Sequence, residues 1–242
     1  LGAVDYISKP FSPPIILARI KTHLALALQK RELEREVLRR TEELERSRRG
    51  LIRRLGLAAE YKDNETGLHV QRMAEYARLI ALEMGVSEED AETLAAAAPM
   101  HDIGKLGIPD AILCKPGRLT DEEFDTIKGH PEIGARILEN PDSELLSVAR
   151  EIALYHHEKW DGSGYPSGLS GEAIPLYARI ASLADVFDAL VSERPYKKAW
   201  SIPDAIALFE EQKEKHFDPR VVDAFKRVLP KVLDVKERLK EG

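Results

Sequence analysis

The fold of this chain is constrained most by a widely spaced series of histidines and aspartates. Imidazoles and carboxylates together suit first-row transition metals, and an adjacent pair of ligands can serve two neighbouring ions. A single histidine is more often an ordinary core or surface residue, but a series with five of the chain's seven histidines is poorly explained in that way. We therefore expect a fold that brings these residues into one multinuclear metal site: His69, His101, Asp102, His130, His156, His157 and Asp185.

The composition favours a helical protein with a single main core. At 242 residues the chain can bury one large core, or one domain and a fragment of another. Aromatic residues are 6% and charged residues 32% of the sequence, a balance that favours helices over sheets. The net charge of −6 provides no overall basic field, so we expect no nucleic acid polymer as a partner.

The location expected from the sequence is the cytoplasm. Cys114 is the only cysteine, which excludes an internal disulfide and a cysteine-rich zinc site and fits a reducing compartment. The most membrane-like stretch, 15–28, is interrupted by basic residues well short of the ~20 residues that a span needs. The sequence does not open with a charged-then-apolar signal peptide, so we expect no membrane partner.

The first residues resemble the end of another domain. A short β-forming stretch is followed by prolines, and a single strand without a partner is not a domain. Lys9-Pro10-Phe11 with the helical stretch after it resembles the end of a response-regulator receiver domain, in which the Lys-Pro bond is usually cis. We therefore expect residues 1–29 to be the C-terminal remnant of a receiver domain that lies upstream.

A long helix is expected from about Ile15 to Tyr61, because this stretch contains no proline. Its charged middle, 30–51, is predicted to be a linker. Only half of a heptad seam is apolar there, so a coiled-coil homodimer and a solvated single helix are both open. The apolar positions are Val37, Leu44 and Leu51, and the polar companion positions are Arg40, Ser47 and Arg54.

The rest of the chain is predicted to be a series of helices, so the expected fold class is all-α. The helix that starts at Ser87 should reach His101, and the turn-rich stretch 158–172 should be a loop. Other predicted helix boundaries are starts at Glu65, Thr120 and Asp218 and an end at Gly85.

His101-Asp102-Ile-Gly-Lys105 is the centre of the predicted site. The Asp102 carboxylate is able to bridge two ions, which makes Asp102, together with Lys105, a catalytic candidate. If the helix continues, Lys105 lies near the same face as His101, where its ammonium could bind a substrate phosphate.

Together these motifs resemble the HD-GYP family of phosphodiesterases, a branch of the HD phosphohydrolases. The resemblance implies an HD-type helical bundle with an extra C-terminal helical region, over 52–242 of this chain, after the long connecting helix. It also implies two or three metal ions and hydrolysis of the bacterial second messenger cyclic di-GMP to linear pGpG, GMP or both, as the output domain of a response regulator. The matching stretches are 63–69, 101–105, 130–131, 156–166 and 185–197.

The ligand residues divide between two ions that share Asp102. Two such ions can clamp a phosphodiester and lower the pKa of a bound water toward about 7. Iron or manganese is expected, while zinc, nickel and others also suit these ligands. The first ion would take His69, His101, Asp102 and Asp185, and the second would take Asp102, His130, His156 and His157.

The resemblance assigns four further residues. Glu65 accompanies a third metal in the family, although glutamate is also common at a helix start. Tyr165, in the Gly-Tyr-Pro loop, would reach a substrate base or phosphate, and this loop is implicated in contacts with other signalling proteins. Arg194 and Lys197 match positions that contact substrate phosphates or guanine; without the resemblance they form a solvated basic run.

Two rival functions remain. A general HD nucleotide phosphohydrolase is disfavoured by the His156-His157 doublet and by the Gly-Tyr-Pro loop. A non-catalytic sensor or interaction module is disfavoured by the intact set of ligands. The sequence does not distinguish cyclic di-GMP from a mixed guanine–adenine cyclic dinucleotide.

Overall fold

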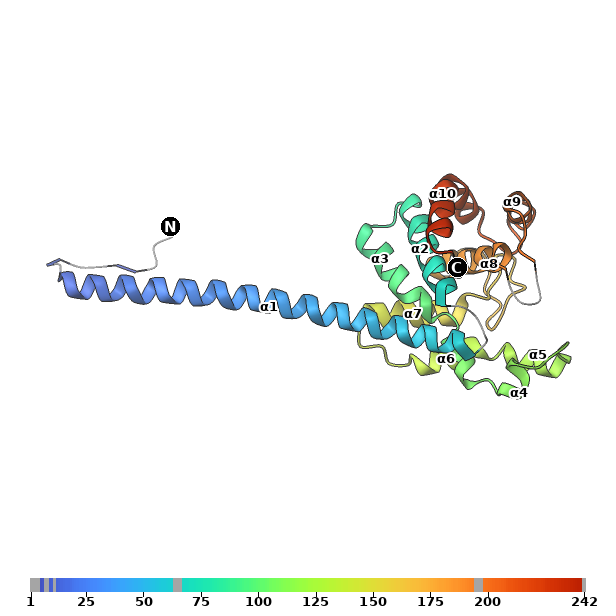
Figure 1. The fold of residues 1–242 in the computed structure, drawn as a ribbon, viewed down its shortest axis with the longest axis horizontal. Coiled ribbons are helices and arrows are strands. Elements are labelled where there is room, and N and C mark those ends of the chain that lie inside the picture. Colours follow the sequence, from blue (N-terminus) through green and yellow to red (C-terminus); the bar gives the residue numbers. More distant parts are fainter. Residues whose placement is uncertain (1–4, 7–8, 11, 63–66, 194–197, 241–242) are drawn as a thin grey trace. The chain divides into compact units, whose positions relative to one another are not determined.

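The protein is described by a computed structural model that covers residues 5–6, 9–10, 12–62, 67–193 and 198–240. It divides into two compact units, Leu1–Gly50 and Leu51–Gly242. The described residues form helices and no β-strand, so the predicted all-α class is confirmed (Figure 1). The α-helices are α1 (Pro13–Lys62), α2 (Gly67–Glu83), α3 (Glu88–Ala97), α4 (Asp110–Leu113), α5 (Asp121–Ile127), α6 (His130–Ile137), α7 (Glu144–Tyr155), α8 (Leu176–Val191), α9 (Ile202–Glu211) and α10 (Pro219–Arg238). Three short 3-10 helices are η1 (Ala98–Met100), η2 (Ile103–Gly107) and η3 (Gly171–Ala173).

In the first unit, the described residues from Pro13 onward belong to α1, in agreement with the long helix predicted over 15–61. The Lys9–Pro10 bond is cis, as the receiver resemblance implies. Leu44, one of the apolar positions of the predicted heptad seam, has 68% of its surface exposed in the single chain. The receiver remnant, the linker boundaries and the coiled-coil homodimer stay predictions.

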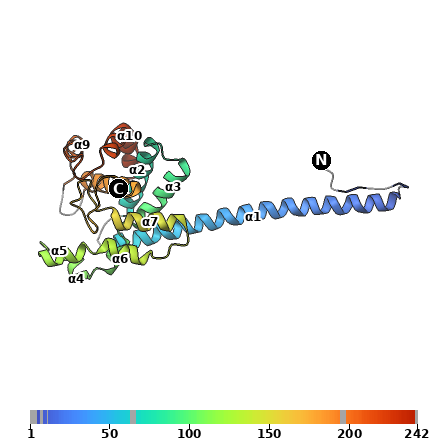
Figure 2. The same cartoon turned by 180° about the vertical axis from the view of Figure 1, so that it is seen from behind.

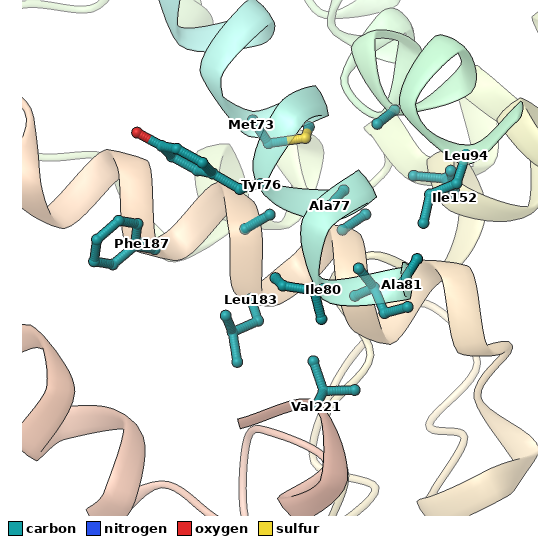
Figure 3. Packing of buried hydrophobic residues seen from close by; sticks show 14 of the residues in the cluster. Met73, Tyr76, Ala77, Ile80, Ala81, Leu94, Ile152, Leu183, Phe187 and Val221 are labelled. Atoms are coloured by element: carbon teal, nitrogen blue, oxygen red, sulfur yellow. The ribbon is translucent and has the colours of Figure 1, made fainter. Parts of the chain in front are cut away.

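The second unit is a bundle built around α2. One face of α2 is fully buried, and it packs against α3, α8 and α10 (Figure 3). Burying each large side chain of this face contributes about 1.5–3 kcal/mol, so the packing holds α2, and the predicted ligand His69 on it, in place. The buried residues of this face include Met73, Tyr76, Ala77 and Ile80, and those facing them include Leu94, Leu183, Phe187 and Val221.

Capping residues start the helices where the sequence predicts. The Ser87 hydroxyl accepts a hydrogen bond from the Asp90 backbone N–H at the start of α3. Thr120 and Glu123 form a complete capping box on α5, and the Asp218 side chain caps α10. Each cap satisfies a backbone N–H that has no partner within its helix.

The helix predicted to reach His101 ends earlier, at Ala97. The chain then tightens into η1, which contains Pro99, and η2 follows after the His101-Asp102 turn. Proline inside an α-helix lacks the N–H and clashes with the preceding turn, so the regular helix stops. The condition under which Lys105 was expected near the face of His101, an α-helix that continues past His101, is therefore not met.

The reverse view shows α4 and α5 next to each other at one edge of the second unit (Figure 2). They carry no buried residue, so they contribute little to the core. Within the described part of the chain, no helix combines the length and apolar character that crossing a lipid bilayer requires.

Candidate metal centre

Seven of the eight predicted metal ligands, all except Glu65, are described by the structure, and they meet in the second unit. His69 comes from α2 and Asp185 from α8. The His101-Asp102 pair forms the turn between η1 and η2, where the chain has left the α-helix. The other three ligands lie at helix ends, with His130 opening α6 and His156-His157 directly following α7.

The first group of candidate ligands consists of Asp102, His130, His156 and His157, each of which offers one atom within 4.8 Å of the others. Oδ1 of Asp102 lies 3.1 Å from Nε2 of His130 and 3.5 Å from Nε2 of His156. This set is the one predicted for the second ion. The close approach of η2 to α6 requires Gly104, because a Cβ there would lie 1.9 Å from the His130 carbonyl oxygen.

Backbone carbonyls orient two of these rings. Nδ1 of His130 lies 2.7 Å from the Ile127 carbonyl oxygen, and Nδ1 of His156 lies 3.0 Å from that of Ile152. A carbonyl oxygen only accepts hydrogen bonds, so each Nδ1 carries the proton and each Nε2 presents a lone pair. Both rings therefore offer Nε2 to the cluster.

The second group of candidate ligands contains Glu60, His69 and His101, whose nitrogen and oxygen atoms also lie within 4.8 Å of one another. Oδ1 of Asp185 lies 3.3 Å from Nε2 of His69 and 3.9 Å from Nε2 of His101. Glu60, on α1, is fully buried and was not foreseen from the sequence. A carboxylate at the end of a long helix full of glutamates gives no signal that separates it from the others.

Asp102 stands between the two groups. Its Oδ2 lies 3.2 Å from Nε2 of His101, while its Oδ1 faces His130 and His156. Yet Nε2 of His101 and Oδ1 of Asp102 are buried without a hydrogen bond of acceptable geometry. Buried polar atoms are normally paired, so atoms that converge in this way fit a shared cation. The cluster could thus bind metal ions, and its imidazole and carboxylate ligands suit divalent transition metals.

The charges of the cluster favour a cation as well. Burial would lower the pKa of His101, but Asp102, Asp185 and Glu60 together outweigh it and raise that pKa to about 9, because these carboxylates favour a positive charge at this position. Burial would raise the pKa of Asp102, but Lys105 and His101 hold it well below its usual range. Burial keeps the pKa of His157 well below its ordinary value. The carboxylate is thus ionised and the His157 imidazole neutral, the forms in which each binds metal.

A buried acid behind the ligands was also missed. Oδ2 of Asp188 lies 2.9 Å from Nδ1 of His69, and Arg72 donates to both oxygens of Asp188 at 2.7 and 2.8 Å. Asp188 follows Asp185 by three residues on α8, and Arg72 follows His69 by three on α2. This shared-face spacing is the signal that could have identified the pair.

Of the four residues predicted to contact the substrate, the structure describes Lys105 and Tyr165. Nζ of Lys105 lies 2.8 Å from Oδ2 of Asp102, so the ammonium reaches the cluster although the helix does not continue. The Tyr165 ring stacks on the His157 ring, with centroids 4.7 Å apart and planes at 23°. Glu65, Arg194 and Lys197 lie outside the described residues.

Known proteins similar to this chain include HD-domain proteins and phosphodiesterases. The sequence model of a family described as "HD domain" matches residues 54–221. The chain is 45% identical, over 93% of its length and 62% of the relative's, to the "Cyclic di-GMP phosphodiesterase response regulator RpfG" of Xanthomonas campestris pv. campestris. It is 44% identical, over 75% of its length and 35% of the relative's, to the "3'3'-cGAMP-specific phosphodiesterase 2" of Vibrio cholerae. The chain thus spans less than two thirds of the length of these relatives.

Solved structures support the fold. The cyclic GMP-AMP-specific phosphodiesterase V-cGAP3 of V. cholerae superposes with a TM-score of 0.59 at 21% identity, over 79% of this chain and 52% of that one. The HD domain of the L. monocytogenes phosphodiesterase PgpH, in complex with cyclic-di-AMP, gives a TM-score of 0.54 at 16% identity, over 79% and 98%.

Proposed function

The chain belongs to the HD-domain family, and from this premise we propose that its second unit is a metal-dependent phosphodiesterase that hydrolyses cyclic di-GMP. The observation that carries the proposal is the position of Asp102, whose two oxygens face two separate groups of histidines. One carboxylate between two ligand groups is suited to two neighbouring ions, which is the arrangement that phosphodiester hydrolysis uses. The name of RpfG supports the choice of substrate.

Each group of residues has a distinct part in this proposal. Divalent ions, when bound, would supply Lewis-acid stabilisation of the phosphoryl oxygens and activation of water. Iron and manganese remain the expected metals, and zinc and nickel remain compatible. The holding residues are Glu60, His69, His101 and Asp185 on one side, His130, His156 and His157 on the other, and Asp102 between them.

The ammonium of Lys105 and the phenol of Tyr165 would orient the substrate. The Lys105 ammonium lies against Asp102 and can donate to a phosphate oxygen from there. Tyr165 lies on His157 at the edge of the cluster. Arg194 and Lys197 are proposed to bind the substrate, and Glu65 is proposed to add a carboxylate for a third ion. The products would be linear pGpG, GMP or both.

The wider setting is also a proposal. The relative RpfG is named as a response regulator, which supports an upstream receiver domain and a cytoplasmic location. A homodimer through residues 30–51 and contacts of the Gly-Tyr-Pro loop with other signalling proteins remain part of the same hypothesis.

A mixed guanine–adenine cyclic dinucleotide is the second candidate substrate. The observation that favours it is the 44% identity to a relative named as specific for 3'3'-cGAMP. A non-catalytic sensor and a general nucleotide phosphohydrolase are the two rival functions, and product analysis distinguishes both from a cyclic-dinucleotide phosphodiesterase.

The experiment incubates the metal-loaded protein with cyclic di-GMP, with 3'3'-cGAMP and with an ordinary nucleoside triphosphate, and separates products by chromatography. We expect linear dinucleotide and then GMP from cyclic di-GMP. The His157→Ala variant, shown to be folded by circular dichroism, is the control. Binding without hydrolysis would support the sensor, and hydrolysis of the triphosphate alone would support the general phosphohydrolase.

A further inference from the structure

The residue after the histidine doublet, Glu158, is an acid buried to 3% exposure. Its carboxylate accepts hydrogen bonds from the Ser167 backbone N–H at 2.7 Å and from the Leu169 backbone N–H at 3.0 Å. These donors lie 9 and 11 residues further along the chain. The Glu158 carboxylate thus connects the beginning and the end of the segment 158–169, which is called the tyrosine loop here.

The closed loop is held against the doublet. The Tyr165 backbone N–H donates to the His157 carbonyl oxygen at 3.3 Å. A Cβ on Gly164 would lie 2.4 Å from the Lys159 backbone nitrogen and 2.6 Å from the His157 carbonyl oxygen, so the chain before Tyr165 packs closely against the backbone of residues 157–159. The Tyr165 ring, stacked on His157, is therefore carried by a loop whose shape depends on Glu158.

The outer side of the tyrosine loop is fastened separately. The Trp160 backbone N–H donates to the His216 carbonyl oxygen at 3.1 Å, and that of Asp161 donates to Lys215 at 2.8 Å. These bonds hold the start of the loop to the segment before α10. They do not involve residues 163–169. Within that stretch the backbone N–H of Ser163 donates to Asp161 and that of Tyr165 to the His157 carbonyl oxygen, while the N–H groups of Ser167 and Leu169 depend on Glu158.

We propose that Glu158 is a positioning residue, whose carboxylate fixes the tyrosine loop so that Tyr165 lies on His157 beside the metal cluster. This inference rests on the proposed phosphodiesterase function for its effect on catalysis. The effect of Glu158 on the loop is inferred from the two backbone hydrogen bonds alone and does not depend on that function. Hydrogen bonds to an ionised acceptor are about twice as strong as neutral ones, so a carboxylate holds two N–H groups where an amide does not.

The test compares Glu158→Gln with a matched control in the same loop. Gln has the shape of Glu, but its amide presents only one acceptor oxygen and turns an N–H₂ group toward the second donor. The control is Asp161→Asn. Asp161 is exposed, and it also accepts a hydrogen bond from a loop N–H, that of Ser163 at 2.9 Å.

The first readout needs no substrate. Hydrogen–deuterium exchange of residues 165–171 should accelerate about tenfold or more in Glu158→Gln, the effect of losing a charge-assisted hydrogen bond, and stay unchanged in Asp161→Asn, whose own hydrogen bond is to Ser163 outside this stretch. Unchanged exchange in Glu158→Gln would overturn the proposal even if the protein proves to be a phosphodiesterase. If Glu158→Gln does not fold, Glu158→Asp, which keeps the charge but is shorter, gives the same comparison.

The second readout separates positioning from general stability. KM for cyclic di-GMP and kcat are measured for Glu158→Gln, for Tyr165→Phe and for the double variant. If Glu158 acts through Tyr165, the two losses in kcat/KM overlap, so that the double variant is no worse than the more impaired single variant within about twofold. If the double variant instead loses the product of the two single losses in kcat/KM, Glu158 acts independently of Tyr165 and the positioning role is contradicted. Absence of turnover in the wild type would contradict the proposed function, while the exchange result would still decide the loop's dependence on Glu158.

Discussion

Oδ2 of Asp188 lies 2.9 Å from Nδ1 of His69, and both side chains are buried. A carboxylate behind a ligand histidine fixes the ring and makes its other nitrogen a better donor. Asp188→Asn should therefore weaken metal affinity by about 10–100-fold, measured on a variant shown by circular dichroism to be folded, because the substitution also removes the charge that faces the buried Arg72. Competition with a chelator measures the affinity, and Asp234→Asn, an exposed acid on α10, is the control. Equal affinity in wild type and Asp188→Asn would contradict this role.

Loss of one histidine of the doublet should stop turnover. His157→Ala removes a ligand from the group around Asp102, so the variant should hold less metal and retain about 1% or less of wild-type activity, because two-ion chemistry needs both sites filled. Elemental analysis and circular dichroism are measured on the same sample. A variant with reduced metal content and near-normal activity would show that two ions are not required.

Two glutamates, Glu60 and Glu65, are candidates for an additional carboxylate ligand of the cluster. Glu60 lies with His69 and His101, whereas Glu65 is a prediction from the sequence alone. If each contributes a carboxylate to an ion, Glu60→Gln and Glu65→Gln should each lower the metal content by up to about one ion per chain. If only one does so, that residue is the ligand. Glu65→Gln should also slow conversion of linear dinucleotide to GMP more than the first cleavage, and an equal ratio of the two rates would leave Glu65 an ordinary helix-start residue.

Arg194 and Lys197 should act on binding more than on chemistry. Each predicted contact with the substrate is a charge-assisted hydrogen bond, so Arg194→Ala and Lys197→Ala should each weaken binding by about 1.5–3 kcal/mol. Calorimetry with cyclic di-GMP measures this, and Lys198→Ala, the next residue along, is the control. Unchanged affinity in both variants would mean that this run of basic residues is simply solvated.

His216 should make the metal-free protein sensitive to acid. Burial, with a contribution from the charge of Lys159, lowers the pKa of His216 to about 4 from 6.5. The unfolded chain thus binds the proton more readily, so this contribution to stability is complete above pH 6.5 and declines as pH falls toward 4, by about 1.4 kcal/mol per pH unit. Chelator-treated wild type and His216→Gln are unfolded in urea across this range. The difference in free energy of unfolding between them should change with pH, and a constant difference would refute the assignment.

Most residues of the cluster could be predicted because the capacity to bind metal depends on residue type, which the sequence gives directly. Adjacent histidines and aspartates can be recognised in the sequence without knowledge of the fold, and so can the capping residues Thr120 and Asp218. The path of the chain around Lys105 was not predictable in this way, because Pro99 ends the helix while Lys105 still reaches Asp102.

The supporting acids were hidden for a different reason. Glu60, Asp188 and Glu158 look like ordinary helix or loop carboxylates in the sequence. Their roles arise only when packing buries them beside the cluster or beneath the tyrosine loop. Sequence identifies groups that bind metal by their own chemistry, and it misses groups that act through their neighbours.

The family match ends at residue 221, three residues into α10. A fragment cut there would lose Phe225, Val228 and Val232, which are buried in the core that α10 shares with α2. The exposed apolar surface would promote aggregation, and α2 would lose the support that keeps His69 in register with Asp185. The shortest fragment fit for crystallisation or for a metal-binding assay therefore extends through Arg238, well past the last ligand residue.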